Sequence, residues 1–370
     1  MNDFDISKSR LLSLDAFRGF TIAAMISVNN PGDYKEEYEQ LGHADWHGIT
    51  LTDFIFPFFL FIVGVSISLS FSKQLSKGYK PSDFYKKIIK RTLILFALGL
   101  FVNLLTNPTL DGGFRIAGVL QRIAIVFLVC SFLFLKTNWK TQMTIGTIIL
   151  LGYWLMLVFI PVPGLGYPSI DPENNLVSWF DRIALPGALF DVTHDPEGIL
   201  STLPSIVTGI SGLLIGNLIK SDKNPDVVIR RILVAGFISL VVASLWMIIF
   251  PLNKNLWTSS FVLFTSGAAT VILASCIWLI DLNGFNKATS PFVILGSNAI
   301  SVYILSFILL YVVWPPIFGE NNSIIQVFHR YLVQIGFTPK FASLIWSLFY
   351  TTLCYIPMYF LYKKKIFIKV

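Results

Sequence analysis

Four ionisable side chains stand close together at the start of a long apolar run, in the stretch HADWHGITLTDFIFPFFLFIVGVSI. His43, Asp45 and His47 come just before the run, and Asp53 lies inside its start. Histidine accepts and releases protons near neutral pH, and a neighbouring carboxylate can fix its tautomer. His43 and His47 have a spacing that can hold a metal on a helix, but no third ligand completes a metal motif. We therefore expect proton-transfer or nucleophilic chemistry here, without a metal.

Asp53 and Asn29 each have two interpretations. Asp53 follows a His-Gly break at the start of the apolar run, so it either caps a helix or orients a histidine. Asn29 stands in the stretch VNNPG. It either ends a helix before Pro31 or supplies an oriented hydrogen-bond donor.

Charged residues inside apolar segments also need an explanation, since they are costly in lipid and usually face a partner or a cavity. Asp15 and Arg18 are three residues apart, so they share a helix face and can pair. Gln121 and Arg122 lie deeper, with Arg122 about 12 Å into its segment at ~1.5 Å per residue. Arg122 needs a carboxylate, carbonyls or an anionic ligand, and its planar fork suits phosphate. Ligand contact and structural pairing both stay open.

Three further polar patches stand at segment ends or inside segments. Asp195 and Glu197 open one segment, where acidic residues also suit a helix N-terminus. Asn253 and Trp257 open another segment. Ser297 and Asn298 fall inside a third, in LGSNAISVY.

The composition places the chain in a membrane. Of its 370 residues, 54% are hydrophobic and only 13% are charged. About 20 apolar residues cross a bilayer as a helix, and backbone groups in lipid must be satisfied within the segment. We predict an all-α, polytopic helical bundle with about ten transmembrane helices. The expected spans are 12–30, 50–72, 88–106, 114–135, 141–160, 199–219, 228–250, 257–281, 291–313 and 341–362.

The basic residues predict the orientation. Most of the 28 lysines and arginines fall on one side of these spans. By the positive-inside rule, both termini are then cytoplasmic, and His43 lies on the outer side. The net charge of +7 is explained by this topology, so no nucleic-acid partner is expected. We expect a structured outer loop at 161–198 and a surface helix near 323–337. We expect no signal peptide and a multi-pass protein of the bacterial cytoplasmic (inner) membrane.

Several of these stretches resemble one family when they are taken in order. They are RLLSLDAFRGFTIAAMISVNNPG, HADWHGITLTDFIFPFFLFIVGVSI, RIAGVLQRIA, DPEGIL, NKNLWTSSFV and GSNAISVYI. In this order, the stretches resemble the transmembrane domain of heparan-α-glucosaminide N-acetyltransferase and its bacterial relatives. The resemblance implies one transmembrane acyltransferase domain over residues 1–370. Such enzymes move an acetyl group from cytoplasmic acetyl-CoA to an amino sugar on the far side.

The resemblance also implies roles for residues. His43 matches the family's active-site histidine, acting either as a general base or as an acetyl carrier, and Asn29 matches the asparagine of the VN pair. Asn29 could hold the thioester carbonyl, and Asp53 completes the catalytic set. For the coenzyme we select Arg122, Gln121, Arg18, Asn298 and Ser297. For the acceptor substrate we select Trp46, His47, Asp195, Glu197, Asn253 and Trp257.

This chain departs from the family at His47, where the lysosomal enzyme has asparagine, so an essential role for His47 is not expected. The expected partners are acetyl-CoA, an amino-sugar or oligosaccharide acceptor and the lipid bilayer, and the family leaves a homodimer open. The acceptor's identity also stays open.

The alternative function is a secondary transporter of a small anionic or sugar solute. Asp15, Arg18, Asp53 and Arg122 would then line a pathway. Such transporters commonly contain matched repeats, and none is evident here. The alternative also explains the cluster around His43 and Trp46 poorly.

Overall fold

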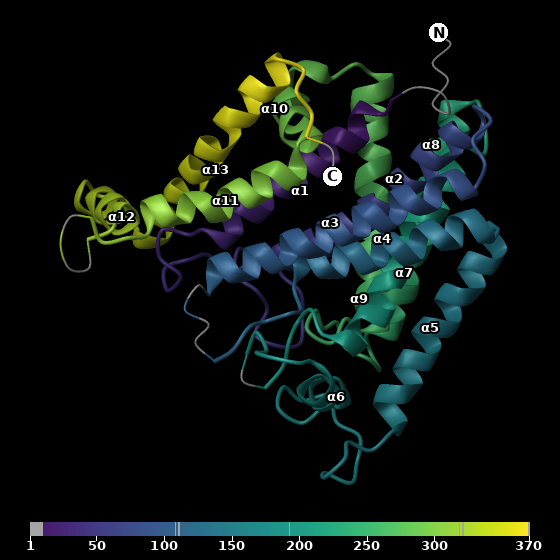
Figure 1. Cartoon of the computed structure of the whole chain (residues 1–370), viewed down its shortest axis with the longest axis horizontal. Helices are drawn as coiled ribbons and strands as arrows, with labels where there is room; N and C mark the ends of the chain where they lie inside the picture. The colour runs from purple at the N-terminus through teal and green to yellow at the C-terminus, as the bar shows by residue number, and fades with distance from the viewer. Residues whose placement is uncertain are drawn as a thin grey trace. The chain divides into compact units, whose positions relative to one another are not determined.

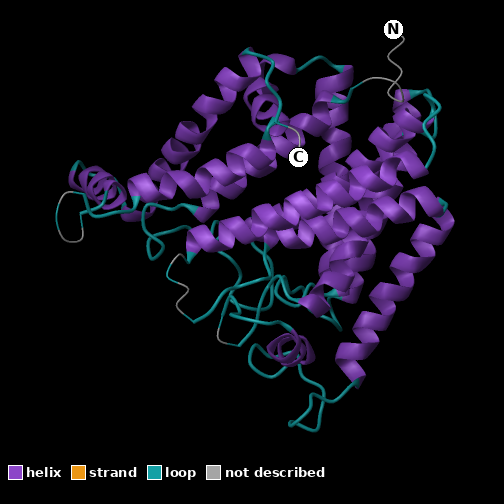
Figure 2. Ribbon diagram, in the orientation of Figure 1, coloured by secondary structure: helices purple, strands orange, loops and turns teal. Residues whose placement is uncertain are grey.

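The computed structural model describes residues 10–107, 109, 112–191, 193–317, 319 and 322–368. Within these ranges the regular structure is helical, with two isolated β-bridges and no strand (Figure 2). The all-α prediction is confirmed. Both chain ends, which we predict to be cytoplasmic, lie outside the described residues.

The chain divides into two compact units, each described by itself below. The large unit contains Asp45–Gly48 and Phe56–Trp278, and the small unit contains Leu12–Ala44, Ile49–Ile55 and the chain from Leu279 onward. The helices of the large unit are α2 (Ile55–Leu75, whose first residue is assigned to the small unit), α3 (Ser82–Thr106), α4 (Val119–Lys136), α5 (Trp139–Phe159), α6 (Leu176–Ala184), α7 (Ile199–Ile219), α8 (Pro225–Trp246) and α9 (Ser259–Cys276) (Figure 1). Those of the small unit are α1 (Leu12–Asn29), η1 (Thr52–Phe54), α10 (Asn286–Ser297), α11 (Ala299–Val313), α12 (Ile324–Gln334) and α13 (Pro339–Lys363); the π-helix η2 (Ile277–Leu282) lies at the boundary.

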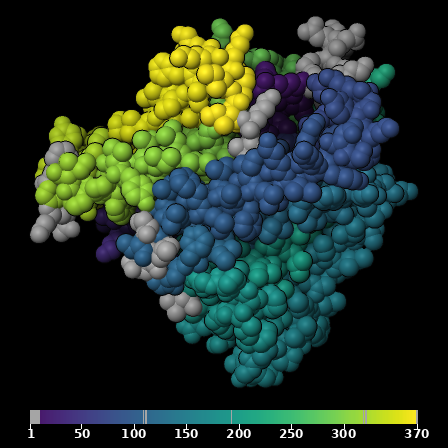
Figure 3. All heavy atoms as spheres, in the orientation of Figure 1, coloured from purple at the N-terminus to yellow at the C-terminus, as the bar shows by residue number. Residues whose placement is uncertain are grey.

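Eight helices of the described chain are long and apolar enough to cross a membrane. The pair α10 and α11 would make a ninth, but it is bent by 76° between Ser297 and Ala299. The predicted span 12–30 forms α1. Helix α1 is not among the eight, because its polar residues lower its mean hydropathy. The chain is therefore a multi-pass membrane protein, while the count of ten stays a prediction. Many side chains of α3 are exposed, and they form part of the face visible in Figure 3.

Helices α6 and α12 fall within two segments that we predict to lie outside the bilayer. Helix α6 lies within residues 161–198, and α12 begins with a capping box formed by Ser323 and Gln326. Their locations relative to a membrane, and the single-domain organisation, stay predictions.

The small unit is organised around α1. Helix α1 packs against α10, α11 and α13. The carboxylate of Asp281 accepts hydrogen bonds from the backbone N–H groups of Leu12, at 2.9 Å, and Ser13, at 3.3 Å. These bonds satisfy donors that a helix start leaves without partners. Asn29 is the last residue of this anchored helix.

Glycines allow α2 and α7 of the large unit to approach closely. A Cβ atom on Gly64 would lie 2.0 Å from the carbonyl oxygen of Gly209. A Cβ on Gly212 would lie 2.1 Å from the carbonyl oxygen of Phe61. Small residues permit such contacts between membrane helices.

We expect the substitution Gly64→Ala to destabilise the protein by about 3 kcal/mol or more, because the added methyl group would overlap backbone that cannot rotate away. Thermal unfolding in detergent measures this effect. Gly152→Ala in α5 is the matched control, because nothing lies within 4 Å of its Cβ position. Equal unfolding temperatures for the two variants would contradict the close approach of α2 and α7.

Candidate active site

His43 is held by a buried aspartate in the small unit. Its Nδ1 lies 2.7 Å from Oδ1 of Asp53. The side chain of His43 is 52% exposed, whereas that of Asp53 is 1% exposed. The two alternatives for Asp53 are therefore resolved in part, since the carboxylate does contact the histidine.

The loop around Asp53 holds the second carboxylate oxygen. Oδ2 accepts hydrogen bonds from the backbone N–H groups of Ala44, at 3.2 Å, and Thr50, at 3.0 Å. The Thr50 hydroxyl lies 3.0 Å from the same oxygen and 2.7 Å from the carbonyl of Gly42. It has one proton, so it donates to one of them at a time. Thr52 donates to the carbonyl of Leu41 at 2.6 Å. The loop is thus folded around the carboxylate.

This geometry determines what the imidazole can do. A carboxylate beside Nδ1 favours the tautomer with the proton on that nitrogen, which places the lone pair on Nε2. The carboxylate also stabilises the positive charge that forms when Nε2 takes up a proton. A half-exposed imidazole held in this way can serve as a general base or as a nucleophile.

Asn29 and Asn30 lie in different environments. Asn29 is exposed, and its carbonyl accepts a hydrogen bond from the Tyr34 hydroxyl at 2.9 Å. Asn30 is buried, and its side chain donates to the carbonyl of Ile26 at 2.7 Å. Asn30 therefore binds the last turn of α1, while the Asn29 side chain lies at the surface.

Three predicted coenzyme residues have partners in the small unit. Arg18 donates to Asp15 at 3.0 Å and to the carbonyl of Gly296 at 3.4 Å, which confirms the predicted pair with Asp15. The Ser297 hydroxyl donates to the carbonyl of Ile294. Asn298 lies at the break between α10 and α11. Its side chain contacts the backbone of the C-terminal segment, donating to Ile366 at 3.2 Å and accepting from Ile368 at 2.9 Å.

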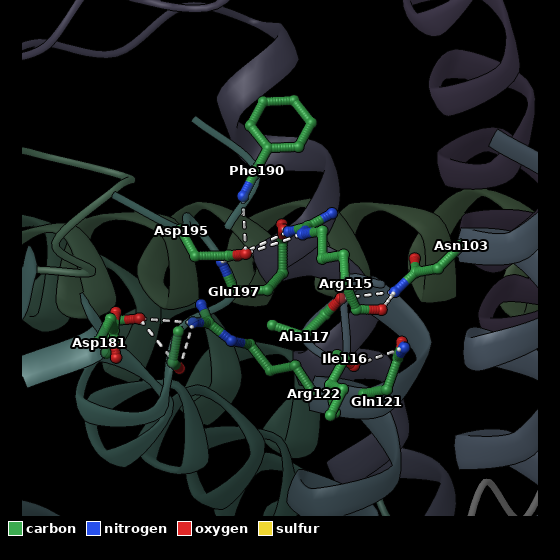
Figure 4. Close-up of polar contacts among 12 residues, drawn as sticks. Asn103, Arg115, Ile116, Ala117, Gln121, Arg122, Asp181, Phe190, Asp195 and Glu197 are labelled. Carbon is green, nitrogen blue, oxygen red and sulfur yellow. Dashed lines mark hydrogen bonds and ion pairs between the residues drawn. The ribbon is translucent and has the colours of Figure 1, made fainter. Parts of the chain in front are cut away.

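The other two predicted coenzyme residues lie in the large unit, at the start of α4 (Figure 4). Gln121 donates to the carbonyl of Ile116 at 2.9 Å. Arg122 is 1% exposed and donates from Nη2 to the carbonyl of Gly198 at 3.1 Å and to Ser201 at 2.5 Å. The ring of Trp257 lies 5.1 Å from its guanidinium carbon. Within the described chain, Nε and Nη1 of Arg122 have no hydrogen-bond partner.

A second arginine binds both acidic residues of the DPEG segment (Figure 4). Arg115 donates to Asp195 from Nε at 2.8 Å and from Nη2 at 2.6 Å, and it contacts Glu197 at 2.6 Å. Burial alone would lower the pKa of Arg115, but hydrogen bonds and charges from the two acids raise it above its ordinary value. These contacts join the loop before α4 to the start of α7. Sequence reasoning did not select Arg115.

Asp181 lies on α6 and is fully buried near Arg122 (Figure 4). Its Oδ1 accepts a hydrogen bond from the N–H of Ile199 at 2.9 Å, so it caps α7 from a different helix. Burial raises the pKa of Asp181 to about 6, while hydrogen bonds from Ile199 and Leu200 and the charge of Arg122 oppose the rise.

The raised pKa of Asp181 predicts a pH-dependent stability. The folded state binds this proton more tightly than the unfolded chain, whose ordinary value is 3.8. The contribution of Asp181 to the free energy of unfolding should therefore fall by up to about 3 kcal/mol as the pH rises from about 4 to about 6. Above about pH 6 this contribution should change little. Thermal unfolding of wild type and Asp181→Asn across this range measures the difference. A difference in unfolding temperature between the two proteins that stays the same across this pH range would contradict the raised pKa of Asp181.

Three of the predicted acceptor residues, Trp46, His47 and Asn253, form a separate group. Trp46 donates from its ring nitrogen to the carbonyl of Ile170 at 2.8 Å, and its ring packs edge-on against His194 at 5.2 Å. Buried Asn253 donates to the carbonyl of Trp46 at 2.9 Å and lies 3.3 Å from Nδ1 of His47. His194 was not among the selected residues.

Trp257, the last of the predicted acceptor residues, lies four residues after Asn253. It is fully buried, has a positive φ of 53° and donates to Thr208 at 3.2 Å. In the described part of the chain, no group of three or more His, Cys, Asp or Glu side chains is placed to hold a metal ion.

Comparison with known proteins agrees with the resemblance. Residues 10–178 match the family model described as heparan-alpha-glucosaminide N-acetyltransferase, catalytic. The heparan-alpha-glucosaminide N-acetyltransferase of Mus musculus is 28% identical over 433 aligned positions, covering 98% of this chain and 61% of that protein. That of Homo sapiens is 30% identical over 332 positions, covering 74% of this chain and 49% of that protein. The chain belongs to this family.

The heparan-alpha-glucosaminide N-acetyltransferase match covers part of the selected site. Its range contains the predicted catalytic residues His43, Asn29 and Asp53, together with Arg122. The other acceptor and coenzyme candidates from Asp195 onward fall outside it. The chain spans about half to three-fifths of the length of these two relatives.

Proposed function

We propose that this protein is a membrane acetyltransferase that moves an acetyl group from acetyl-CoA to the amine of an amino sugar. The observation that carries the proposal is the contact of 2.7 Å between His43 Nδ1 and Asp53. It gives a half-exposed imidazole the fixed orientation that acyl transfer needs. The names of the two curated relatives support the choice of donor group and acceptor class.

In direct transfer, the amino sugar arrives as an ammonium ion and gives one proton to His43 Nε2. The neutral amine then attacks the thioester carbon, so a C–N bond forms and the C–S bond breaks. The nitrogen loses its second proton as the amide forms, and the CoA thiolate takes up a proton. The net products are the N-acetyl sugar, CoA and one released proton.

In the ping-pong route, Nε2 attacks the thioester first. CoA leaves, and an acetyl-imidazole on His43 passes its acetyl group to the amine. Asp53 stabilises the imidazolium charge in both routes. Asn29 is proposed to donate to the oxygen that becomes negative at the acetyl carbon.

Arg122 is the proposed coenzyme residue with the strongest geometric support. Two of its nitrogens have no hydrogen-bond partner in the described ranges, and guanidinium groups suit phosphate. It is 1% exposed, so a coenzyme contact requires groups packed around it, such as Gly198, Ser201 and Trp257, to move. Gln121, Arg18, Ser297 and Asn298 remain proposed contacts with lesser support, because their side chains donate hydrogen bonds to other groups of the protein.

The direction of transfer is part of the proposal. Acetyl-CoA would come from the cytoplasm and the acceptor from the outer, periplasmic side of a bacterial inner membrane, as the distribution of basic residues predicts. Trp46, His47, Asp195, Glu197, Asn253 and Trp257 are the proposed acceptor side of the protein. A homodimer remains compatible with this proposal.

Purified protein with acetyl-CoA and glucosamine separates this function from transport. An acetyltransferase releases free CoA in proportion to added glucosamine, which a thiol reagent detects. A secondary transporter of a small anionic or sugar solute would instead accumulate labelled solute in proteoliposomes without releasing CoA. Uptake without CoA release would overturn the proposal.

A further inference from the structure

A second carboxylate lies beside His43 in the small unit. The turn from Tyr38 to Gly42 is closed by hydrogen bonds from the N–H groups of Leu41, at 2.8 Å, and Gly42, at 3.2 Å, to the carbonyl of Tyr38. A Cβ atom on Gly42 would lie 2.8 Å from Oε1 of Glu37. The Glu37 carboxylate therefore packs against the residue that directly precedes His43.

The two carboxylates near His43 differ in what they bind. Asp53 is buried and is engaged by the loop and by Nδ1 of His43. Glu37 is half-buried, and its carboxylate has no hydrogen bond or ion pair among the described residues. Partial burial raises the pKa of Glu37, and the nearby charge of His43 opposes part of that rise. Glu37 and His43 therefore interact electrostatically, while the oxygens of Glu37 remain available to a ligand.

The surrounding sequence favours a cationic ligand. Asp33, Glu36 and Glu39 accompany Glu37 between Pro31 and His43, with Lys35 as the single basic residue before the histidine. Clustered charge of one sign raises the local concentration of oppositely charged substrates. An amino sugar is mostly an ammonium ion at neutral pH, and its charge must lie beside the base that deprotonates it.

We propose that Glu37 binds the ammonium group of the acceptor and thereby positions the amine for His43. The inference rests on the proposed acetyltransferase function, whose acceptor is an amino sugar, and adds the residue that holds the ammonium group of that sugar. It assigns separate tasks to the two carboxylates. Asp53 orients the imidazole, and Glu37 holds the substrate cation.

Equilibrium binding of glucosamine and N-acetylglucosamine to the full chain in detergent tests this assignment. The second sugar lacks the positive charge. Wild type should bind glucosamine more tightly, and Glu37→Gln should weaken glucosamine binding about tenfold, the range for a charge-assisted hydrogen bond. Binding of N-acetylglucosamine should not change. Glu37→Asp should restore part of the loss, and Asp45→Asn, which removes an exposed charge two residues from His43, is the control.

Kinetics give the second readout. Glu37→Gln should raise the KM for glucosamine about tenfold, with kcat and the KM for acetyl-CoA within twofold of wild type. Unchanged glucosamine affinity in Glu37→Gln, or an equal loss for both sugars, would overturn the role of Glu37. If wild type binds glucosamine through Glu37 but forms no acetylated product, the acetyltransferase proposal fails and the ammonium site stands.

Discussion

Replacing His43 with glutamine should lower kcat for acetyl transfer by at least about 10³-fold, because it removes both the base and the nucleophile. Glutamine keeps a polar side chain of similar length, but it cannot accept a proton near neutral pH. The expected loss is the same for direct transfer and for the ping-pong route. CoA release in the presence of saturating glucosamine measures it.

His47→Gln is the matched control for this experiment. His47 is also exposed, and it lies four residues along the chain. Its substitution should leave kcat at saturating glucosamine within about threefold of wild type, because a residue that contacts only the acceptor acts on KM. A His43→Gln variant that retains more than a tenth of wild-type kcat would contradict the assignment of His43.

The second large effect is expected at Asp53. Asp53→Asn should lower kcat by about 10²- to 10⁴-fold, as the loss of an orienting carboxylate does in other histidine-dependent enzymes. An asparagine that accepts from Nδ1–H turns its NH₂ group toward the N–H groups of Ala44 and Thr50, which are also donors. The opposite amide orientation directs NH₂ at Nδ1 and favours the wrong tautomer.

The separate kinetic parameters test this explanation for Asp53. A residue that positions the base should lower kcat and leave the KM values for glucosamine and acetyl-CoA within about twofold of wild type. Asp45→Asn removes an exposed charge from the same segment and should leave kcat and both KM values unchanged. Thermal unfolding of Asp53→Asn determines how much of the loss reflects a loosened loop. A wild-type kcat in this variant would contradict the positioning role.

The membrane helices were largely predictable because each is a long apolar run. The expected spans 199–219 and 341–362 correspond closely to Ile199–Ile219 and Pro339–Lys363. The expected span 291–313 is broken between Ser297 and Ala299, where Asn298 binds the backbone of the C-terminal segment. That contact joins residues about seventy positions apart, so local hydropathy gave no sign of it.

The contacts between neighbours in sequence were also predictable. Asp15 and Arg18 share a helix face, and Asp53 was considered as an orienting group for a histidine. By contrast, Arg115 contacts Asp195 and Glu197 across about eighty residues. The role of Asp181 as a cap for α7 depends on the folding of α6 against α7. Spacing along the chain carries no signal for such distant pairs. The loop around Asp53 is different, because the Thr50-x-x-Asp53 pattern is a local capping signal that could have indicated it.

The most direct test of the central claim follows an isotopically labelled acetyl group. Purified protein is incubated with acetyl-CoA carrying a ¹³C-labelled acetyl group and with glucosamine, and the sugar is analysed by mass spectrometry. We predict labelled N-acetylglucosamine with wild type and none above background with His43→Ala. Labelled product at equal rates with both proteins, or no labelled amino sugar from wild type with any primary-amine sugar offered, would contradict the account.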